Sequence, residues 1–234
     1  MENGNKIKAI VYALMAAMFY ALNMPLSKVL LTDRSGKEMY WNHNSAYYSW
    51  IKKTVTNCTN ILDVGCGEGS LVRFLDDGYK KITGIDVDGP CIEKAKALSK
   101  SDKEEFLCCD FEEYTTEKVF DAIIFVASIH HMDMVKAIEK AKSLLSPSGK
   151  LIIVGLSKPS SLLDWIIEIG RVIPSKIIST ANNIQNSEEL NVPVSYELPK
   201  MDEVRSTVKR LLPGAGIRYG LHYRYLLVWN KAGN

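Results

Sequence analysis

The sequence predicts an α/β protein with a doubly wound parallel sheet, and two observations carry this prediction. Short apolar runs that suit buried parallel strands alternate with segments of helical spacing over residues 60 to 156. The first of these runs leads directly into three glycines, Gly65, Gly67 and Gly69. A glycine loop between a strand and a helix lets the backbone approach a ligand and turns free N–H groups toward the ligand's polar end. We therefore expect a nucleoside-type ligand at this loop.

Two acidic residues accompany the glycine loop at defined positions. Asp63 lies two residues before the first glycine, and Asp86 ends the next apolar run. An acid at the end of the second strand accepts hydrogen bonds from the ribose hydroxyls of a nucleoside ligand in this architecture. A dinucleotide-binding loop would carry its third glycine at position 70, where this chain has Ser70. The spacing therefore disfavours a nicotinamide oxidoreductase.

This constellation resembles motif I of the class I S-adenosylmethionine-dependent methyltransferases, and Asp86 matches that family's acid after strand 2. The resemblance covers about residues 39 to 231. It implies a Rossmann-like, doubly wound sheet of seven strands that ends in an antiparallel pair. It also implies S-adenosyl-L-methionine as cofactor and in-line transfer of its methyl group. The cofactor-binding residues that we predict are Asp63, Gly65, Cys66, Gly67, Gly69, Asp86, Val87, Asp110, Phe111, Ala127 and Tyr40.

The remaining elements follow from apolar spacing and from capping residues. Asp88-Gly89-Pro90 predicts the start of a helix, and Gly78 predicts the end of the helix that follows the glycine loop. Ser146 to Gly149 predicts a turn before the fifth strand. The expected helices are Tyr40–Lys53, Ser70–Gly78, Pro90–Ala97, one from Met134, and Met201–Leu212. The expected strands are Asn60–Val64, Lys81–Asp86, Glu105–Cys109, Phe120–Val126, Lys150–Leu156, Gly216–Leu221 and Arg224–Asn230.

Residues that follow the third and fourth strands are candidates for adenine binding and for chemistry. The resemblance implies that Asp110 bonds the adenine amino group, with Phe111 beside the ring; a turn or cap role for Asp110 is the alternative. His130 and His131 could remove a proton from the acceptor, because imidazole titrates near neutrality. They could equally cap the next helix or pack on the cofactor.

The acceptor is expected to be a small molecule. No Asn-Pro-Pro-Tyr-type sequence follows the fourth strand, which argues against methylation of adenine or glutamine amide nitrogens, and no Pro-Cys nucleophile follows it either. Residues 157–200 interrupt the alternation of strands and helices, and we interpret them as a lid over the acceptor pocket, with membrane-surface contact as the alternative. A non-catalytic, membrane-tethered nucleoside-binding module is the other function considered.

Composition sets limits on partners and location. The 234 residues carry a net charge of +2 with no lysine- or arginine-rich run, so no nucleic-acid face is expected. The five cysteines form no C-x-x-C pair, so neither a disulfide framework nor a metal site is predicted. We expect the catalytic domain, residues 39–234, to work in the cytoplasm.

Residues 1–38 form a hydrophobic segment ahead of that domain. No charged residue lies between Lys8 and Lys28, and about twenty apolar residues span a bilayer. Three interpretations stay open: a transmembrane helix over residues 9–31 that anchors the enzyme, a signal peptide, or a fused fragment packed elsewhere. The segment Lys8 to Leu31 also resembles the first helix of drug/metabolite transporter proteins. A single span cannot form a transporter, so we expect no transport activity.

Overall fold

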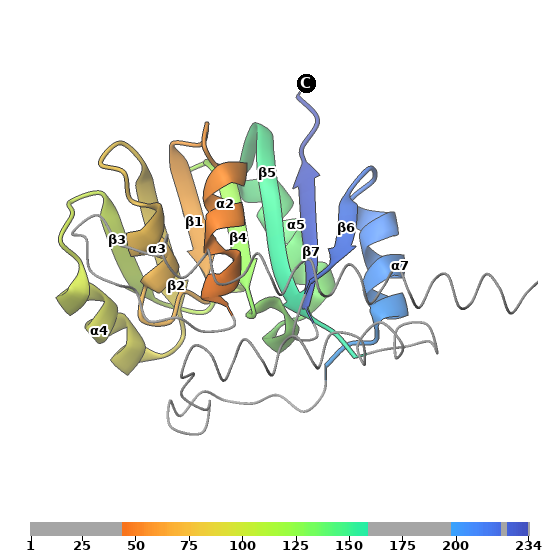
Figure 1. Cartoon of the computed structure of the whole chain (residues 1–234), viewed down its shortest axis with the longest axis horizontal. Helices are drawn as coiled ribbons and strands as arrows, with labels where there is room; N and C mark the ends of the chain where they lie inside the picture. Colours follow the sequence, from red (N-terminus) through yellow and green to blue (C-terminus); the bar gives the residue numbers. More distant parts are fainter. Residues whose placement is uncertain (1–43, 159–197, 221–223, 234) are drawn as a thin grey trace, which may run out of the picture.

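The sheet is the centre of the structure, a computed structural model that describes residues 44–158, 198–220 and 224–233 (Figure 1). Its strand order is β3-β2-β1-β4-β5-β7-β6. Neighbouring strands from β3 to β5 are parallel, whereas β7 runs antiparallel to both β5 and β6. The strands are β1 (Asn60–Val64), β2 (Lys81–Asp86), β3 (Glu104–Cys108), β4 (Phe120–Val126), β5 (Leu145–Leu156), β6 (Gly216–Tyr219) and β7 (Arg224–Asn230). The predicted seven-stranded fold with a C-terminal antiparallel pair is confirmed.

Helices cover both faces of the sheet, as a doubly wound fold requires. The helices are η1 (Ser45–Tyr47), α2 (Tyr48–Thr54), α3 (Ser70–Leu75), α4 (Gly89–Leu98), η2 (Ile129–His131), α5 (Met134–Leu144) and α7 (Met201–Leu211). Side chains of α2, α3 and α4 pack in the core on one face of the sheet, and those of α5 and α7 pack in the core on the other. Figure 1 shows how these helices are arranged around the sheet. Strand β1 consequently has Ile61, Leu62 and Val64 fully buried, which explains its unbroken apolar run.

Local capping chemistry sets several helix boundaries. The carboxylate of Asp88 accepts the N–H of Cys91 at 3.0 Å, with proline in the first turn of α4, as predicted. The predicted extension of the helix after the loop to Gly78 is wrong. Helix α3 ends at Leu75 because Asp76 turns extended and its carboxylate accepts the N–H of Gly78 at 2.8 Å.

Strand β5 also begins earlier than predicted. Leu145 already pairs with Phe120, and the register then shifts so that Lys150 pairs with Ala122. The predicted turn, residues 146–149, is therefore an irregular section inside the strand, and Ser148 takes a positive φ of 64° there. The strand from Lys150 onward agrees with the prediction.

Several predictions fall on residues that the structure does not describe. These are the hydrophobic segment 9–31, the cofactor contact of Tyr40, and most of the lid-like insert, residues 159–197. Within the described ranges, no helix combines the length and the apolar character that crossing a membrane demands. The anchor, the lid and the division at residue 38 stay predictions.

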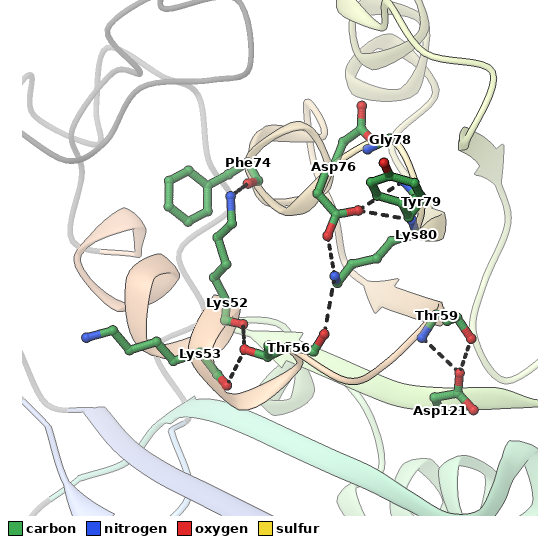
Figure 2. Close-up of polar contacts among 11 residues, drawn as sticks. Lys52, Lys53, Thr56, Thr59, Phe74, Asp76, Gly78, Tyr79, Lys80 and Asp121 are labelled. Carbon is green, nitrogen blue, oxygen red and sulfur yellow. Dashed lines mark hydrogen bonds and ion pairs between the residues drawn. The ribbon is translucent and has the colours of Figure 1, made fainter.

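Asp121, at the start of β4, forms hydrogen bonds to neighbouring segments at the amino edge of the sheet, among them those to Thr59 in Figure 2. Its Oδ2 accepts the N–H and the hydroxyl of Thr59 at 2.9 and 2.7 Å and the N–H of Asn60 at 3.0 Å. Its Oδ1 accepts the hydroxyl of Ser146 at 3.1 Å. Desolvation raises the pKa of Asp121, but the hydrogen bonds from Asn60 and Thr59 outweigh it and leave the pKa below its ordinary value. Ionised Asp121 therefore stabilises the connection between α2 and β1.

Replacing Asp121 should measurably weaken the fold. We expect Asp121→Ala to lower the free energy of unfolding by roughly 1–3 kcal/mol, because three donors at the start of β1 lose their acceptor. Its matched control is Asp102→Ala at the same edge, where the carboxylate is 85% exposed and pairs with Lys103. Urea unfolding at pH 7 measures both variants. The stability advantage of the wild type over Asp121→Ala should disappear as the pH falls through the lowered pKa of Asp121. Equal losses in the two variants would contradict the assignment.

Candidate active site

The glycine loop connects the end of β1 to the start of α3 and carries three left-handed residues. Gly65, Gly67 and Gly69 have φ of 77°, 51° and 72°, a region that favours glycine. A Cβ at Gly65 would lie 2.3 Å from the Cβ of Ser128, whereas a Cβ at Gly67 would meet no atom within 4 Å. The loop is therefore packed at its start against Ser128, in the segment after β4, and open at its middle, where its backbone can approach a ligand.

Hydrogen bonds from the second strand hold this loop in place. The N–H groups of Gly65 and Cys66 both donate to the carbonyl of Ile85, at 2.8 and 3.0 Å. The N–H of Gly67 donates to Oδ2 of Asp86 at 2.8 Å, and the N–H of Asp88 donates to Oδ1 of the same side chain at 3.0 Å. Asp86 thus fixes the loop and stands directly beside its open part. Its predicted ribose contact fits this position.

Asp63 is a buried carboxyl in the middle of the sheet, between Gly84 of β2 and Ile124 of β4. Only 2% of it is exposed. Burial, with a smaller contribution from the negative charge of Asp86, raises the pKa of Asp63 to about 7. Among the described residues, the hydrogen bonds that hold the loop to β2 go to Asp86 and Ile85, and the role of Asp63 in orienting the loop stays a prediction.

The raised pKa of Asp63 makes the fold sensitive to pH. An unfolded aspartate titrates near ~3.9, so the contribution of Asp63 to stability is fully present below that pH and is lost as the pH rises through about 7. We expect Asp63→Asn to raise the free energy of unfolding at pH 8 by roughly 2–4 kcal/mol and to change it little at pH 4. Urea unfolding without cofactor at both pH values measures this, with Asp102→Asn as exposed control. A stabilisation that is the same at both pH values would refute it.

The predicted adenine-side residues lie after β2 and β3. Oδ1 of Asp110 accepts the N–H of Glu112 at 2.7 Å, so Asp110 forms the turn that was the alternative for it. Phe111 is 2% exposed, and its ring packs edge-on against Phe125 with centroids 5.5 Å apart. Val87 is 68% exposed next to Asp86, where an apolar side chain suits a planar ligand ring. Adenine contacts from Asp110 and Phe111 stay predictions, and little of the Phe111 ring is free to make one.

The segment after β4 lies against the start of the glycine loop. Ala127 takes a positive φ of 53°, and the hydroxyl of Ser128 donates to the carbonyl of Val64 at 2.5 Å. Ser128 was missed by sequence reasoning. The signal that could have identified Ser128 is its position just after the fourth strand, because that strand lies beside the one that leads into the glycine loop.

The two histidines of η2 stack on each other with ring centroids 4.1 Å apart. Burial first, then His131 and Arg224, lower the pKa of His130 to about 4, so its imidazole is neutral near pH 7. Among the described residues, buried Nδ1 of His130 has no hydrogen-bond partner. Helix α5 takes its cap from Asp133, whose Oδ1 accepts the N–H groups of Val135 and Lys136. The histidines are therefore not required to cap α5, and Nδ1 of His130 is available to another partner.

Arg224, the first residue of β7, is the other residue that sequence reasoning missed. It pairs with Leu156 at the carboxyl end of β5, is 8% exposed, and donates from Nη2 to Oδ1 of Asn44 at 2.5 Å. A single arginine at the head of an apolar strand carries no sequence signal of its own. The structure brings it to the edge where the glycine loop and His130 lie.

Comparisons with known proteins agree with this geometry. The methyltransferase domain family matches residues 62–153. An uncharacterised methyltransferase of Mycobacterium tuberculosis is 29% identical over 201 residues, which cover 81% of this chain and 96% of that protein. A malonyl-[acyl-carrier protein] O-methyltransferase of Priestia megaterium is 31% identical over 134 residues, 50% of this chain and 49% of that enzyme.

Two solved structures share the fold. A Pyrococcus horikoshii protein superposes with a TM-score of 0.57 at 22% identity, covering 79% of this chain and 87% of that one. Magnesium protoporphyrin IX methyltransferase from Synechocystis, solved with bound S-adenosylhomocysteine, gives 0.53 at 16% identity over 81% of each chain. None of the relatives named here is a transporter, and the transporter resemblance of residues 8–31 stays a prediction.

Proposed function

Because this chain is a class I S-adenosyl-L-methionine-dependent methyltransferase, we propose that it methylates a small-molecule acceptor. The observation that carries the acceptor class is the segment Ala127 to His131, which lies at the glycine loop and has neither an Asn-Pro-Pro-Tyr nor a Pro-Cys sequence. The names of relatives support the same class: one is an (S)-tetrahydroprotoberberine N-methyltransferase of Eschscholzia californica, 27% identical over 40% of this chain and 28% of that enzyme.

The residues at the loop fit the cofactor. The open face at Gly67 offers the backbone to its methionine portion, Asp86 offers a carboxylate to its ribose, and exposed Val87 offers an apolar face to its adenine. S-adenosyl-L-methionine supplies an electrophilic methyl group on a sulfonium, so the chemistry is already activated. The protein mainly has to align donor and acceptor and exclude water.

Within this proposal, His130 is the group that could hold the acceptor's proton. Its neutral imidazole has a free nitrogen, but a pKa of about 4 makes it a weak base. It therefore suits an acceptor that is acidic or ionised before it binds, and it would serve mainly to orient such a group. His131, stacked against it, lowers its pKa further and is proposed to position its ring.

The acceptor class can be tested by following a labelled methyl group. The full-length protein is incubated with S-adenosyl-L-methionine labelled in its methyl group and with a cell extract divided into protein, nucleic-acid and small-molecule fractions. We expect the label in the small-molecule fraction. Transfer only to protein or nucleic acid would refute the proposal. Calorimetric titration with S-adenosylhomocysteine and with NAD, in parallel, should give binding of the first compound and none of the second.

A further inference from the structure

Residues 66–69 of the glycine loop form a tight turn in which the protein itself holds most of the peptide groups. The N–H of Gly69 donates to the carbonyl of Cys66 at 2.9 Å and closes the turn. The N–H of Gly67 donates to Asp86. The N–H of Glu68, by contrast, has no hydrogen-bond partner in the described part of the chain. This N–H and the open side of Gly67 are therefore what the turn offers to a ligand.

Arg73 of α3 bonds the same turn from the helix. Its Nη1 donates to the carbonyl of Glu68 at 2.5 Å, and its Nη2 donates to the hydroxyl of Ser70 at 3.4 Å. Its backbone N–H donates to the carbonyl of Gly69 at 3.0 Å. One residue thus bonds two consecutive carbonyls of the loop, and the bond from the charged guanidinium is stronger than one from a neutral donor.

These bonds fix the peptide group between Glu68 and Gly69 at both ends. Its N–H is bonded to Cys66 and its carbonyl to Arg73, so the group cannot rotate without breaking one of the two bonds. Glycine leaves the backbone free to rotate, and three of the five loop residues are glycines. Helix α3 has no side-chain cap at Gly69, so Arg73 supplies the side-chain bond between the helix and the turn.

Glu68 has a second basic partner, which contacts its side chain and not its carbonyl. Nζ of Lys94 in α4 lies 2.5 Å from Oε1 of Glu68, and the two side chains are 56% and 40% exposed. Exposed ion pairs of this kind contribute little, and a bond to the end of a flexible side chain leaves the backbone free to rotate. The backbone restraint at Glu68 therefore comes from Arg73, and Lys94 offers a matched comparison.

We propose that Arg73 is a positioning residue for the methionine portion of the cofactor. By holding the carbonyl of Glu68, it keeps the N–H of Glu68 and the open side of Gly67 in the orientation that the cofactor binds. A loop that is already ordered loses less conformational freedom on binding, which raises affinity. This inference rests on the proposed placement of the methionine portion at Gly67, and it does not depend on which acceptor is methylated.

Two ligands separate this role from general stability. S-adenosylhomocysteine carries the amino-acid part of the cofactor, and 5′-methylthioadenosine is the corresponding nucleoside thioether without it. Both are titrated by calorimetry into the full-length protein. Arg73→Met keeps the aliphatic stem and removes the donors, so we expect it to weaken S-adenosylhomocysteine about ten-fold and 5′-methylthioadenosine less than about two-fold. Arg73→Lys keeps one charged donor and should weaken S-adenosylhomocysteine only about three-fold.

The matched control is Lys94→Met, which removes the other partner of Glu68 and should change the affinity for either ligand less than about two-fold. If Arg73 only stabilises α3, Arg73→Met should lower thermal stability and weaken both ligands equally, which would overturn the inference. Undiminished binding of S-adenosylhomocysteine by Arg73→Met would overturn it too. A wild type that binds both ligands equally would overturn it together with the placement of the methionine portion at Gly67. Should Arg73→Met fail to fold, the ratio of the two affinities in Arg73→Lys decides, and an unchanged ratio would overturn the inference.

Discussion

Asp86→Ala is expected to weaken binding of S-adenosylhomocysteine at least a hundred-fold, as measured by calorimetry on the full-length protein. The carboxylate supports the glycine loop and is proposed to bind the cofactor's ribose, and the variant loses both functions. One oxygen accepts the N–H of Gly67 at 2.8 Å and so holds the open part of the loop, and the other accepts the N–H of Asp88 at 3.0 Å. Each hydrogen bond to a charged acceptor contributes about 1.5–3 kcal/mol, so losing the ribose contact as well as the loop support amounts to roughly this factor.

The control for this variant lies two residues further along the chain. Asp88→Ala removes the N-cap of α4, whose carboxylate accepts the N–H of Cys91 at 3.0 Å. That loss should cost about 1 kcal/mol of stability and change the affinity for S-adenosylhomocysteine by less than about three-fold. Asp86→Asn keeps the size of the side chain and should fall between the two. Retained affinity in Asp86→Ala would show that the ribose contact is made elsewhere.

The parts of the fold that the sequence predicted well depend on local chemistry. Asp88 caps α4 and Pro90 stands in its first turn, as their adjacent positions predicted, and the apolar run before the glycine loop forms a strand covered on both faces. The end of α3 and the start of β5 were missed for different reasons, one local and one not. Helix α3 ends at a local turn, in which the Asp76 carboxylate accepts the N–H of Gly78 two residues later, and Gly78 alone did not indicate that turn. The start of β5 depends on the pairing of Leu145 with Phe120 across the sheet, which sequence spacing does not report.

In the candidate site too, some residues could be predicted from their position in the sequence and others could not. Asp86 was predicted from its place at a strand end, and its bond to Gly67 follows from the meeting of adjacent strands. Arg224 and Asn44 are 180 positions apart, so no spacing could have joined them. The burial of Phe111 likewise depends on packing against Phe125 of β4 and Lys140 of α5, which a family resemblance does not report. The turn at Asp110 is a local bond to Glu112, and the sequence had offered it as the alternative.

Gly65→Ala should lose both stability and cofactor binding. Alanine there must adopt a φ of 77°, and its Cβ would lie 2.3 Å from the Cβ of Ser128, a separation that real atoms do not show. Strain and overpacking together should lower the free energy of unfolding by roughly 2–4 kcal/mol. Because relief of the clash requires the loop to move away from Ser128, the affinity for S-adenosylhomocysteine should fall at least ten-fold.

Two further variants separate the two causes. Gly214→Ala imposes a φ of 79° where a Cβ meets no atom within 4 Å, so it should cost only about 1–2 kcal/mol and leave cofactor affinity unchanged. The double variant Gly65→Ala, Ser128→Gly removes the opposing Cβ and, with it, the hydroxyl that donates to Val64. If steric contact with Ser128 is what fixes glycine at position 65, the double variant should bind S-adenosylhomocysteine better than Gly65→Ala alone. If the double variant binds no better, backbone strain at position 65 accounts for the whole effect. In that case, urea unfolding of the wild type and the three variants should show Gly65→Ala and Gly214→Ala to be equally destabilised.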